Sequence, residues 1–175
     1  MKIQQKIYSF NLGRVSRLKY YVFFLLLLIV TSYKGAAQDP EFEWAKRIGS
    51  TNNDFGYAID MDSEGNVYTT GSFRGTVDFD PGSGVFNLSS TQDAIFILKL
   101  NSVGAFVWAK QLGGGSNPNS GYAISIFVDN EGNVYTTGQF SGVNDFDPGN
   151  NVFNLTSFGG TDVFISKLNS EGEFI

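Results

Sequence analysis

The sequence predicts an all-β fold made of two copies of one unit, and three observations support this prediction. A stretch of ten residues, DSEGNVYTTG at 62–71, returns as DNEGNVYTTG at 129–138. Short runs rich in β-branched and aromatic residues alternate with Gly, Asn and Asp, which is typical of strands joined by tight turns. Outside the N-terminal segment, no window carries an apolar stripe of helical period.

The duplication extends over most of the chain. Further segments recur in the same order, at offsets that drift from 64 to 68 residues: WAKRIG and WAKQLG, GYAI twice, FDPG twice, VFNL twice, and FILKLNSVGAF and FISKLNSEGEF. The offset changes mainly in Gly-, Asn- and Ser-rich stretches, where insertions cost least. Such a long internal period indicates a repeat architecture, in which each unit is one supersecondary module.

Each unit is expected to form four antiparallel strands. In the first unit these strands are YAIDMD, VYTTGSF, AIFILKL and AFVWAKQL. AIFILKL is apolar at almost every position, which favours a strand covered on both faces. Four-stranded sheets stacked between neighbours are the blades of a β-propeller. The chain is therefore predicted to hold two propeller units of about 65 residues in an incomplete ring. A two-sheet β-sandwich is the alternative, but it does not explain the long period.

The connector GTVDFDPGSGVFNLSS joins the second strand of the first unit to the third. Asp80, Pro81, Gly82 and Ser83 fit a type II turn, because proline presets φ at the second position and glycine supplies φ > 0 at the third. VDF and VFNL could pair across this turn as a small extra hairpin.

The first 37 residues have the composition of a signal peptide. They hold six basic residues and no acid, followed by the apolar run YYVFFLLLLIV and small residues suited to cleavage after Ala37. A retained membrane anchor is the alternative, yet only 14 uncharged residues separate Lys19 from Lys34. As a helix they span about 21 Å, against about 30 Å of hydrocarbon. The positive-inside rule sends residue 38 onward out of the cytoplasm, to a secreted or cell-surface location.

The predicted organisation has four parts. They are a signal peptide at 1–37, a lead-in strand with the WAK motif and its loop at 38–56, one repeat unit at 57–113, and a second, truncated repeat unit at 114–175. Beyond residue 37 the chain holds 6 Lys+Arg and 17 Asp+Glu, a formal charge of −11. This excess disfavours nucleic acid and anionic membrane surfaces as partners, because both need a positive patch.

The order of the motifs GYAI, D-x-x-GNVYTTG, FDPG, DVFISKLNSEG and WAK resembles the bacterial SBBP-type β-propeller repeat of large exported surface proteins. The resemblance covers nearly all of residues 42–175. It implies a closed ring of more blades, often joined to a C-terminal sorting domain. The second unit lacks its WAK strand, so the chain is expected to be the N-terminal fragment of a longer protein, or a truncated reading frame. The missing blades of the full-length chain would then be its partners.

Two sets of acids could hold calcium. Asp60, Asp62 and Glu64 precede Gly65 as in a calcium loop, but the closing position falls on Gly71 and the second copy loses the pattern. We therefore predict turns, in which the first side chain accepts from the backbone and the glycine is left-handed. Asn101 and Asn169 take the same place in the other hairpins, so a neutral amide is expected to suffice at Asp62 and Asp129 as well. A second set of acids recurs at equivalent positions of both units: Asp78, Asp80, Asp145 and Asp147. This recurrence favours a structural role in turns and leaves calcium binding as a weak hypothesis.

No catalytic site is predicted. The chain contains no histidine and no cysteine, which excludes disulfides and the usual nucleophilic triads. Trp44 and Trp108 could stack on carbohydrate, but their regular recurrence favours an inter-blade core. We predict a non-enzymatic exported protein, without a required cofactor, for surface display, adhesion or binding of an extracellular protein or carbohydrate. The candidate binding loops are GSTNNDFG at 49–56 and GGGSNPNSG at 113–121. The alternative is the N-terminal part of an extracellular propeller enzyme acting on glycans, which needs non-repeating polar residues converging on a channel.

Overall fold

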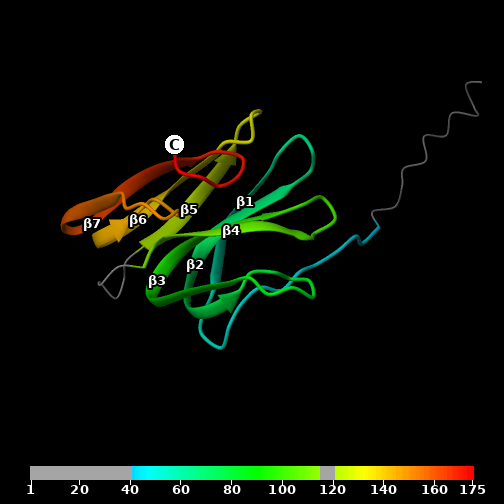
Figure 1. Cartoon of the computed structure of the whole chain (residues 1–175), viewed down its shortest axis with the longest axis horizontal. Helices are drawn as coiled ribbons and strands as arrows, with labels where there is room; N and C mark the ends of the chain where they lie inside the picture. The colour runs from blue at the N-terminus through cyan, green and yellow to red at the C-terminus, as the bar shows by residue number, and fades with distance from the viewer. Residues whose placement is uncertain (1–40, 115–120) are drawn as a thin grey trace, which may run out of the picture. The chain divides into compact units, whose positions relative to one another are not determined.

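Two antiparallel sheets make up the fold. The computed structural model describes residues 41–114 and 121–175, and every regular element in these residues is a β-strand. Blade 1, in the order β1-β2-β3-β4, consists of β1 (Phe55–Met61), β2 (Val67–Asp78), β3 (Asn87–Leu100) and β4 (Phe106–Gly113), as Figure 1 shows. Blade 2, in the order β5-β6-β7, consists of β5 (Gly121–Val128), β6 (Val134–Asp145) and β7 (Asn154–Leu168). The predicted all-β fold of incomplete propeller blades is confirmed.

The N-terminal segment predicted to be a signal peptide lies outside the described residues. Within the part of the chain that the structure describes, no helix is long and apolar enough to cross a membrane.

Strand β3 is buried on both faces, as its unbroken apolar sequence predicted. Its residues 94–98 are at most 7% exposed. Ile95 and Ile97 face the cluster shared with blade 2, whereas Phe96 and Leu98 face a second cluster on the other side of blade 1. Full burial of a large apolar side chain stabilises a fold by about 1.5–3 kcal/mol. This strand is therefore the main source of apolar packing in blade 1.

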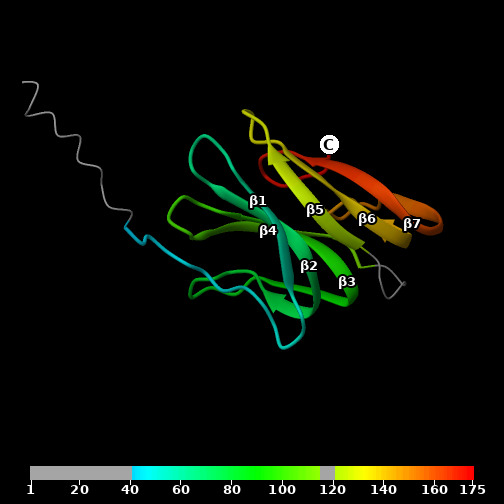
Figure 2. The ribbon, with the colours of Figure 1, turned by 180° about the vertical axis from the view of Figure 1, so that it is seen from behind.

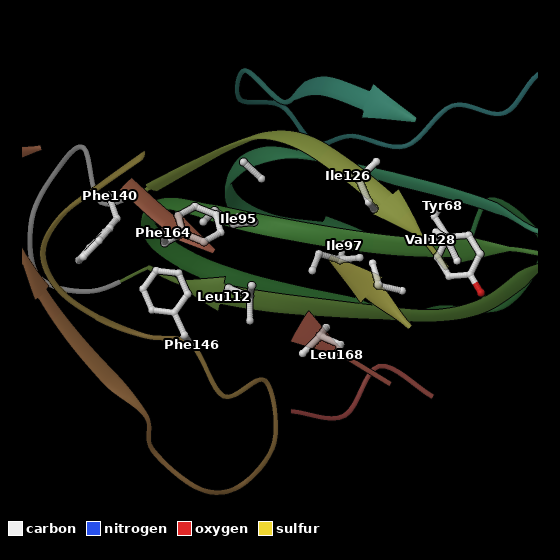
Figure 3. Packing of buried hydrophobic residues seen from close by; sticks show 12 residues of the cluster. Tyr68, Ile95, Ile97, Leu112, Ile126, Val128, Phe140, Phe146, Phe164 and Leu168 are labelled. Atoms are coloured by element: carbon white, nitrogen blue, oxygen red, sulfur yellow. The ribbon is translucent and has the colours of Figure 1, made fainter. Parts of the chain in front are cut away.

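One apolar core joins the two blades. Figure 3 shows it from close by, with side chains of both sheets pointing toward one another. Blade 1 contributes Tyr68, Ile95, Ile97 and Leu112, and blade 2 contributes Ala123, Ile126, Val128, Val134, Phe140, Phe146, Phe164 and Leu168. We call the side of each sheet that carries Tyr68 or its repeat counterpart Tyr135 the back face, and the opposite side the front face. The back face of blade 1 thus packs on the front face of blade 2.

Strands β2 and β3 continue past the body of the sheet as the small extra hairpin suggested by the connector. After a register shift at Phe73/Gly75, pairing resumes and runs to Asp78 opposite Asn87. The backbone N–H of Phe79 donates to the carbonyl of Phe86 at 2.9 Å. The predicted type II turn is wrong, because Gly82 is not among the glycines with positive φ. Instead the Asp80 side chain accepts from the Gly82 N–H at 2.7 Å and closes the turn locally.

Strands β1 and β5 pair with β2 and β6 in different registers, although both strands carry the repeated motif GYAI. Gly56 of the first GYAI pairs with Gly71, whereas Gly121 of the second GYAI pairs with Phe140. The strand partners instead align Ile59 with Ile126, since they pair with the equivalent residues Thr69 and Thr136. The GYAI copies are therefore displaced by two residues. The register irregularity follows Gly56 in β1 but follows Ala123 in β5, so the alanine of the motif changes face. Ala58 lies on the back face opposite Thr70, whereas Ala123 lies on the front face opposite Gly138.

The WAK segment at the start of the described chain corrects one expectation. A lead-in strand was expected within residues 38–56, but residues 41–54 form no strand in the structure. A strand needs a neighbour to satisfy its backbone groups, and no described strand pairs with this segment. Its side chains are nevertheless ordered against blade 1, where Trp44 and Ile48 pack on the apolar cluster of the front face. Figure 2 shows this segment, in cyan, from the other side.

Candidate functional site

The repeated acids at the β1–β2 and β5–β6 hairpins are turn residues. Asp62 Oδ1 accepts from the backbone N–H groups of Glu64 and Asn66, at 3.0 and 2.9 Å. Asp129 makes the same two bonds in blade 2. Gly65 completes the first turn with φ of 78°, a left-handed value that favours glycine. These bonds confirm the turn interpretation of the DSEG motif.

Asp60, the other acid of that motif, faces a different part of the molecule. Its Oδ2 accepts from the backbone N–H of Val128 at 2.7 Å, across the boundary between the blades. Its Oδ1 accepts from the N–H of Met61 at 2.9 Å. Asp60 and Asp62 therefore serve separate hydrogen-bond networks and do not converge as calcium ligands would.

The carboxylate of Asp62 accepts more hydrogen bonds than the amide of Asn101, which takes the corresponding position in the other hairpin of blade 1. Asn101 accepts from two backbone N–H groups through Oδ1 alone. Asp62 also accepts, through Oδ2, from Asn66 Nδ2 at 2.8 Å and from the Tyr68 hydroxyl at 3.1 Å. An amide nitrogen at that position would face another donor, so the charge is useful here, contrary to the expectation that a neutral amide suffices.

These bonds have electrostatic consequences on both partners. Burial on its own would raise the pKa of Asp62, but the hydrogen bonds from Asn66, Tyr68 and Glu64 together lower this pKa below its usual value. Burial, followed by the hydrogen bond and the charge of Asp62, raises the pKa of the Tyr68 hydroxyl. Tyr68 therefore stays protonated and donates at every physiological pH.

The acids of the repeated segment DFDPG, at 78–82 and 145–149, are the predicted weak calcium ligands, and in the structure they accept hydrogen bonds from backbone amides. Asp78 Oδ1 accepts from the N–H groups of Asp80 and Phe86, at 3.0 and 2.8 Å. The Asp145 carboxylate makes the two equivalent bonds in blade 2, at the same distances. The structure brings each pair together in one turn, but the two pairs lie on different sheets. Among the described residues there is no group of three or more potential metal-binding side chains. Calcium binding therefore stays a prediction.

The two tryptophans make the same contact one blade apart. Trp44 Nε1 donates to the carbonyl of Ser102 at 3.2 Å, and Trp108 Nε1 donates to the carbonyl of Ser170 at 3.1 Å. Trp108 also meets the Tyr68 ring edge-on, with centroids 6.0 Å apart. The predicted inter-blade role is confirmed for Trp108, because it belongs to blade 1 and caps a hairpin of blade 2.

The candidate binding loop at 49–56 borders a polar hollow that the sequence did not single out. Asp54 Oδ2 accepts from the N–H and hydroxyl of Ser50, and Asn52 Nδ2 donates to the carbonyl of Arg74 at 3.1 Å. The hollow has a volume of about 390 Å³ and is lined by Asn52, Arg74, Gly75, Thr76, Ser89, Ser90 and Thr91. The second candidate loop falls largely outside the described residues, since 115–120 are not described.

The signal that could have found this hollow is a break in the repeat. Arg74 corresponds to Ser141 in the second unit, and Thr76 corresponds to Val143. Exposed residues that differ between otherwise equal units are free from the packing that keeps the units alike. A guanidinium beside hydroxyl and amide groups can bind anionic or hydroxyl-rich ligands through several hydrogen bonds.

The comparison with known proteins agrees with the repeat architecture. Two segments, residues 43–72 and 107–147, match the family model SBBP, described as a beta-propeller repeat. A WD repeat-containing protein of Acanthamoeba polyphaga mimivirus, described as uncharacterized, is 30% identical over 146 residues. That alignment covers 75% of this chain and 10% of the viral protein, so the chain spans about a tenth of the length of that relative.

Proposed function

Because the chain belongs to the SBBP-type β-propeller repeat family, we propose that it is an exported, non-enzymatic repeat protein that binds an extracellular protein or carbohydrate. The observation that carries the proposal is the contrast between a uniform scaffold and one variable polar hollow. Repeat scaffolds commonly present binding residues on exposed loops, while the packed positions stay constant.

The uniform part supports a scaffold role. The carboxylates of Asp62 and Asp129 each make two bonds to backbone amides, and those of Asp78 and Asp145 do the same. A catalytic acid on a repeat scaffold should break the repeat, because only one site needs it. These acids occur in both units and are engaged in turns, so they support a structural role rather than catalysis.

The variable hollow supports ligand binding. Arg74 is exposed, and the hydroxyls of Thr76 and Ser89 lie 2.9 Å apart on neighbouring strands. The hollow is open, and apart from Arg74 and Asn52 its lining residues are glycine, serine and threonine. A sugar or an anionic side chain of a protein partner would find both hydroxyl and guanidinium donors there. Export is proposed from the sequence alone, from the basic and apolar character of residues 1–37.

The experiment compares repeat swaps for binding to immobilised glycans and extracellular matrix proteins. Arg74→Ser places the blade 2 residue in the hollow, and Ser83→Asn, the matched control, places the blade 2 residue in a remote exposed turn. We expect Arg74→Ser to lose binding to the glycan or protein that the unmutated chain binds, and Ser83→Asn to keep this binding. Equal binding by Arg74→Ser and the unmutated chain would contradict the site, and turnover of a bound glycan would contradict the non-enzymatic role.

A further inference from the structure

Strand β7 has one open side where its repeat counterpart β3 is covered. β3 lies between β2 and β4, whereas within the described residues β7 pairs only with β6, apart from one bridge between Leu168 and Phe174. A strand edge with unpaired N–H and C=O groups is a template for another strand. The edge of β7 is therefore the position of a fourth strand that the described residues do not supply.

The back face of blade 2 is exposed at the positions where blade 1 is buried. Ile95 and Ile97 of β3 are both 0% exposed. Their counterparts on β7, Val163 and Ile165, are 73% and 78% exposed. The same two positions thus carry β-branched side chains that are buried in blade 1 and exposed in blade 2. This difference indicates that the back face of blade 2 lacks a packing neighbour among the described residues, because the residue type is the same in both blades.

The front face of blade 1 is open in the complementary way. Ile126 and Val128 of β5 are 8% and 7% exposed, because the back face of blade 1 covers them. Their counterparts by strand pairing, Ile59 and Met61 of β1, are 68% and 62% exposed. An apolar hollow of about 290 Å³ lies here, with Ile59, Phe73 and Leu98 among its lining residues.

A segment that could fill the open position on β7 is present at the start of blade 1. WAKRIG at 44–49 repeats WAKQLG at 108–113, which is most of β4. The Trp44 bond to Ser102 matches the Trp108 bond to Ser170, and Trp108 makes its bond as part of the fourth strand of the preceding blade. Residues 44–49 therefore already contact blade 1 as the fourth strand of a preceding blade would, but they pair with no strand among the described residues.

We propose that residues 44–49 of a second copy of this chain pair with β7 as its fourth strand, and that the back face of blade 2 then packs on the front face of blade 1 of that copy. The pairs Ile95–Leu112, Ile97–Lys110 and Lys99–Trp108 of β3 and β4 set the register. Transferred to the second unit, they give Val163–Ile48, Ile165–Lys46 and Lys167–Trp44. Ile48 thereby takes the place of Leu112, which is 0% exposed in the inter-blade core.

Two features of the interface follow from its construction. The donor surface and the acceptor surface are different patches, so the contact is head-to-tail and closes only if successive rotations form a ring. The charge of −11 beyond residue 37 makes copies repel one another. Salt screens such repulsion over about 10 Å at 0.1 M, so added salt strengthens the association.

The experiment uses single cysteines in the full chain, which has none of its own. Ile165→Cys and Lys46→Cys are made in separately tagged chains, mixed, and oxidised with oxidised glutathione. Directly opposed residues of antiparallel strands have Cα atoms about 4.5–5.5 Å apart, within reach of a disulfide. Arg47→Cys is the matched control, because the neighbouring residue of a strand points to the opposite face. All three positions are exposed, so the variants keep the fold.

We expect a mixed disulfide between the Ile165→Cys and Lys46→Cys chains, and its loss when Arg47→Cys replaces Lys46→Cys. Two results would overturn the proposal. One is an equal yield of mixed disulfide with the Arg47→Cys control. The other is a symmetric disulfide between two Ile165→Cys chains as the main product, since this would mean that β7 pairs with β7 or with an unrelated surface.

Discussion

Several residues of the repeated ten-residue stretch at 62–71 make specific contacts that explain their repetition. Asp62 accepts four hydrogen bonds from three residues, Gly65 takes a left-handed φ, and the Thr70 hydroxyl donates to the carbonyl of Phe96 at 2.7 Å. Gly71 lies opposite the irregularity in β1, and a Cβ there would overlap the carbonyl oxygen of Phe55. The stretch is repeated because one hairpin and one strand crossing are built the same way in each blade.

Gly71→Ala tests the closest of these approaches. The added methyl meets backbone, which cannot rotate away, so we expect the free energy of unfolding to fall by about 1–3 kcal/mol, the usual cost of overpacking. Urea unfolding followed by circular dichroism measures this change. Gly160→Ala is the matched control, because a Cβ at Gly160 meets no atom within 4 Å. An equal effect of both substitutions would contradict the steric account.

At the scale of the strands and hairpins, the sequence predicted element type well and element detail poorly. The strands and the hairpin extension of β2 and β3 could be read from apolar runs and turn residues, because these depend on local chemistry. The displacement of GYAI between β1 and β5 could not, because identical residues take the register irregularity at different places, after Gly56 in β1 and after Ala123 in β5. The type II turn failed because a side chain, Asp80, closed the turn where φ > 0 was expected.

The candidate sites show the same division. Turn acids could be recognised because Asn replaced Asp at the second hairpin of each unit. The break in the repeat at Arg74 marks the position, but the hollow itself could not be predicted. Its lining comes from the loop before β1 and from the parts of β2 and β3 that pair after a register shift. The prediction of a lead-in strand was wrong for a different reason: whether residues 44–49 form a strand depends on a neighbour that the described residues do not supply.

Asp78 separates the structural account of the FDPG hairpin from the calcium hypothesis. Asp78→Ala leaves the N–H groups of Asp80 and Phe86 without their acceptor, and we expect it to cost about 1–3 kcal/mol of stability. Asp78→Asn keeps an acceptor oxygen and should cost much less. Thermal melting in calcium and in chelator provides the second readout. A calcium-dependent rise in Tm that disappears when Asp78 and Asp145 are both changed to Asn would contradict a purely structural role.

For the whole molecule, the central feature is that its two outer faces are complementary halves of the interface it already contains. Val163 and Ile165 are exposed where Ile95 and Ile97 are core, and Ile59 and Met61 are exposed where Ile126 and Val128 are core. Repeat units depend on stacked neighbours for their apolar core. Two blades alone should therefore be poorly stable or self-associating.

The most direct test of this claim is the mass of the chain in solution, measured by sedimentation over a range of concentrations. The unmutated chain is compared with Ile165→Asp, which places a charge on the open face of β7 at a position that is 78% exposed. Both chains carry the same N-terminal segment, so any association through that segment is equal in the two. We predict that the unmutated chain associates as its concentration rises and that Ile165→Asp shifts it toward monomer. A monodisperse, cooperatively melting monomer in both cases would contradict the account.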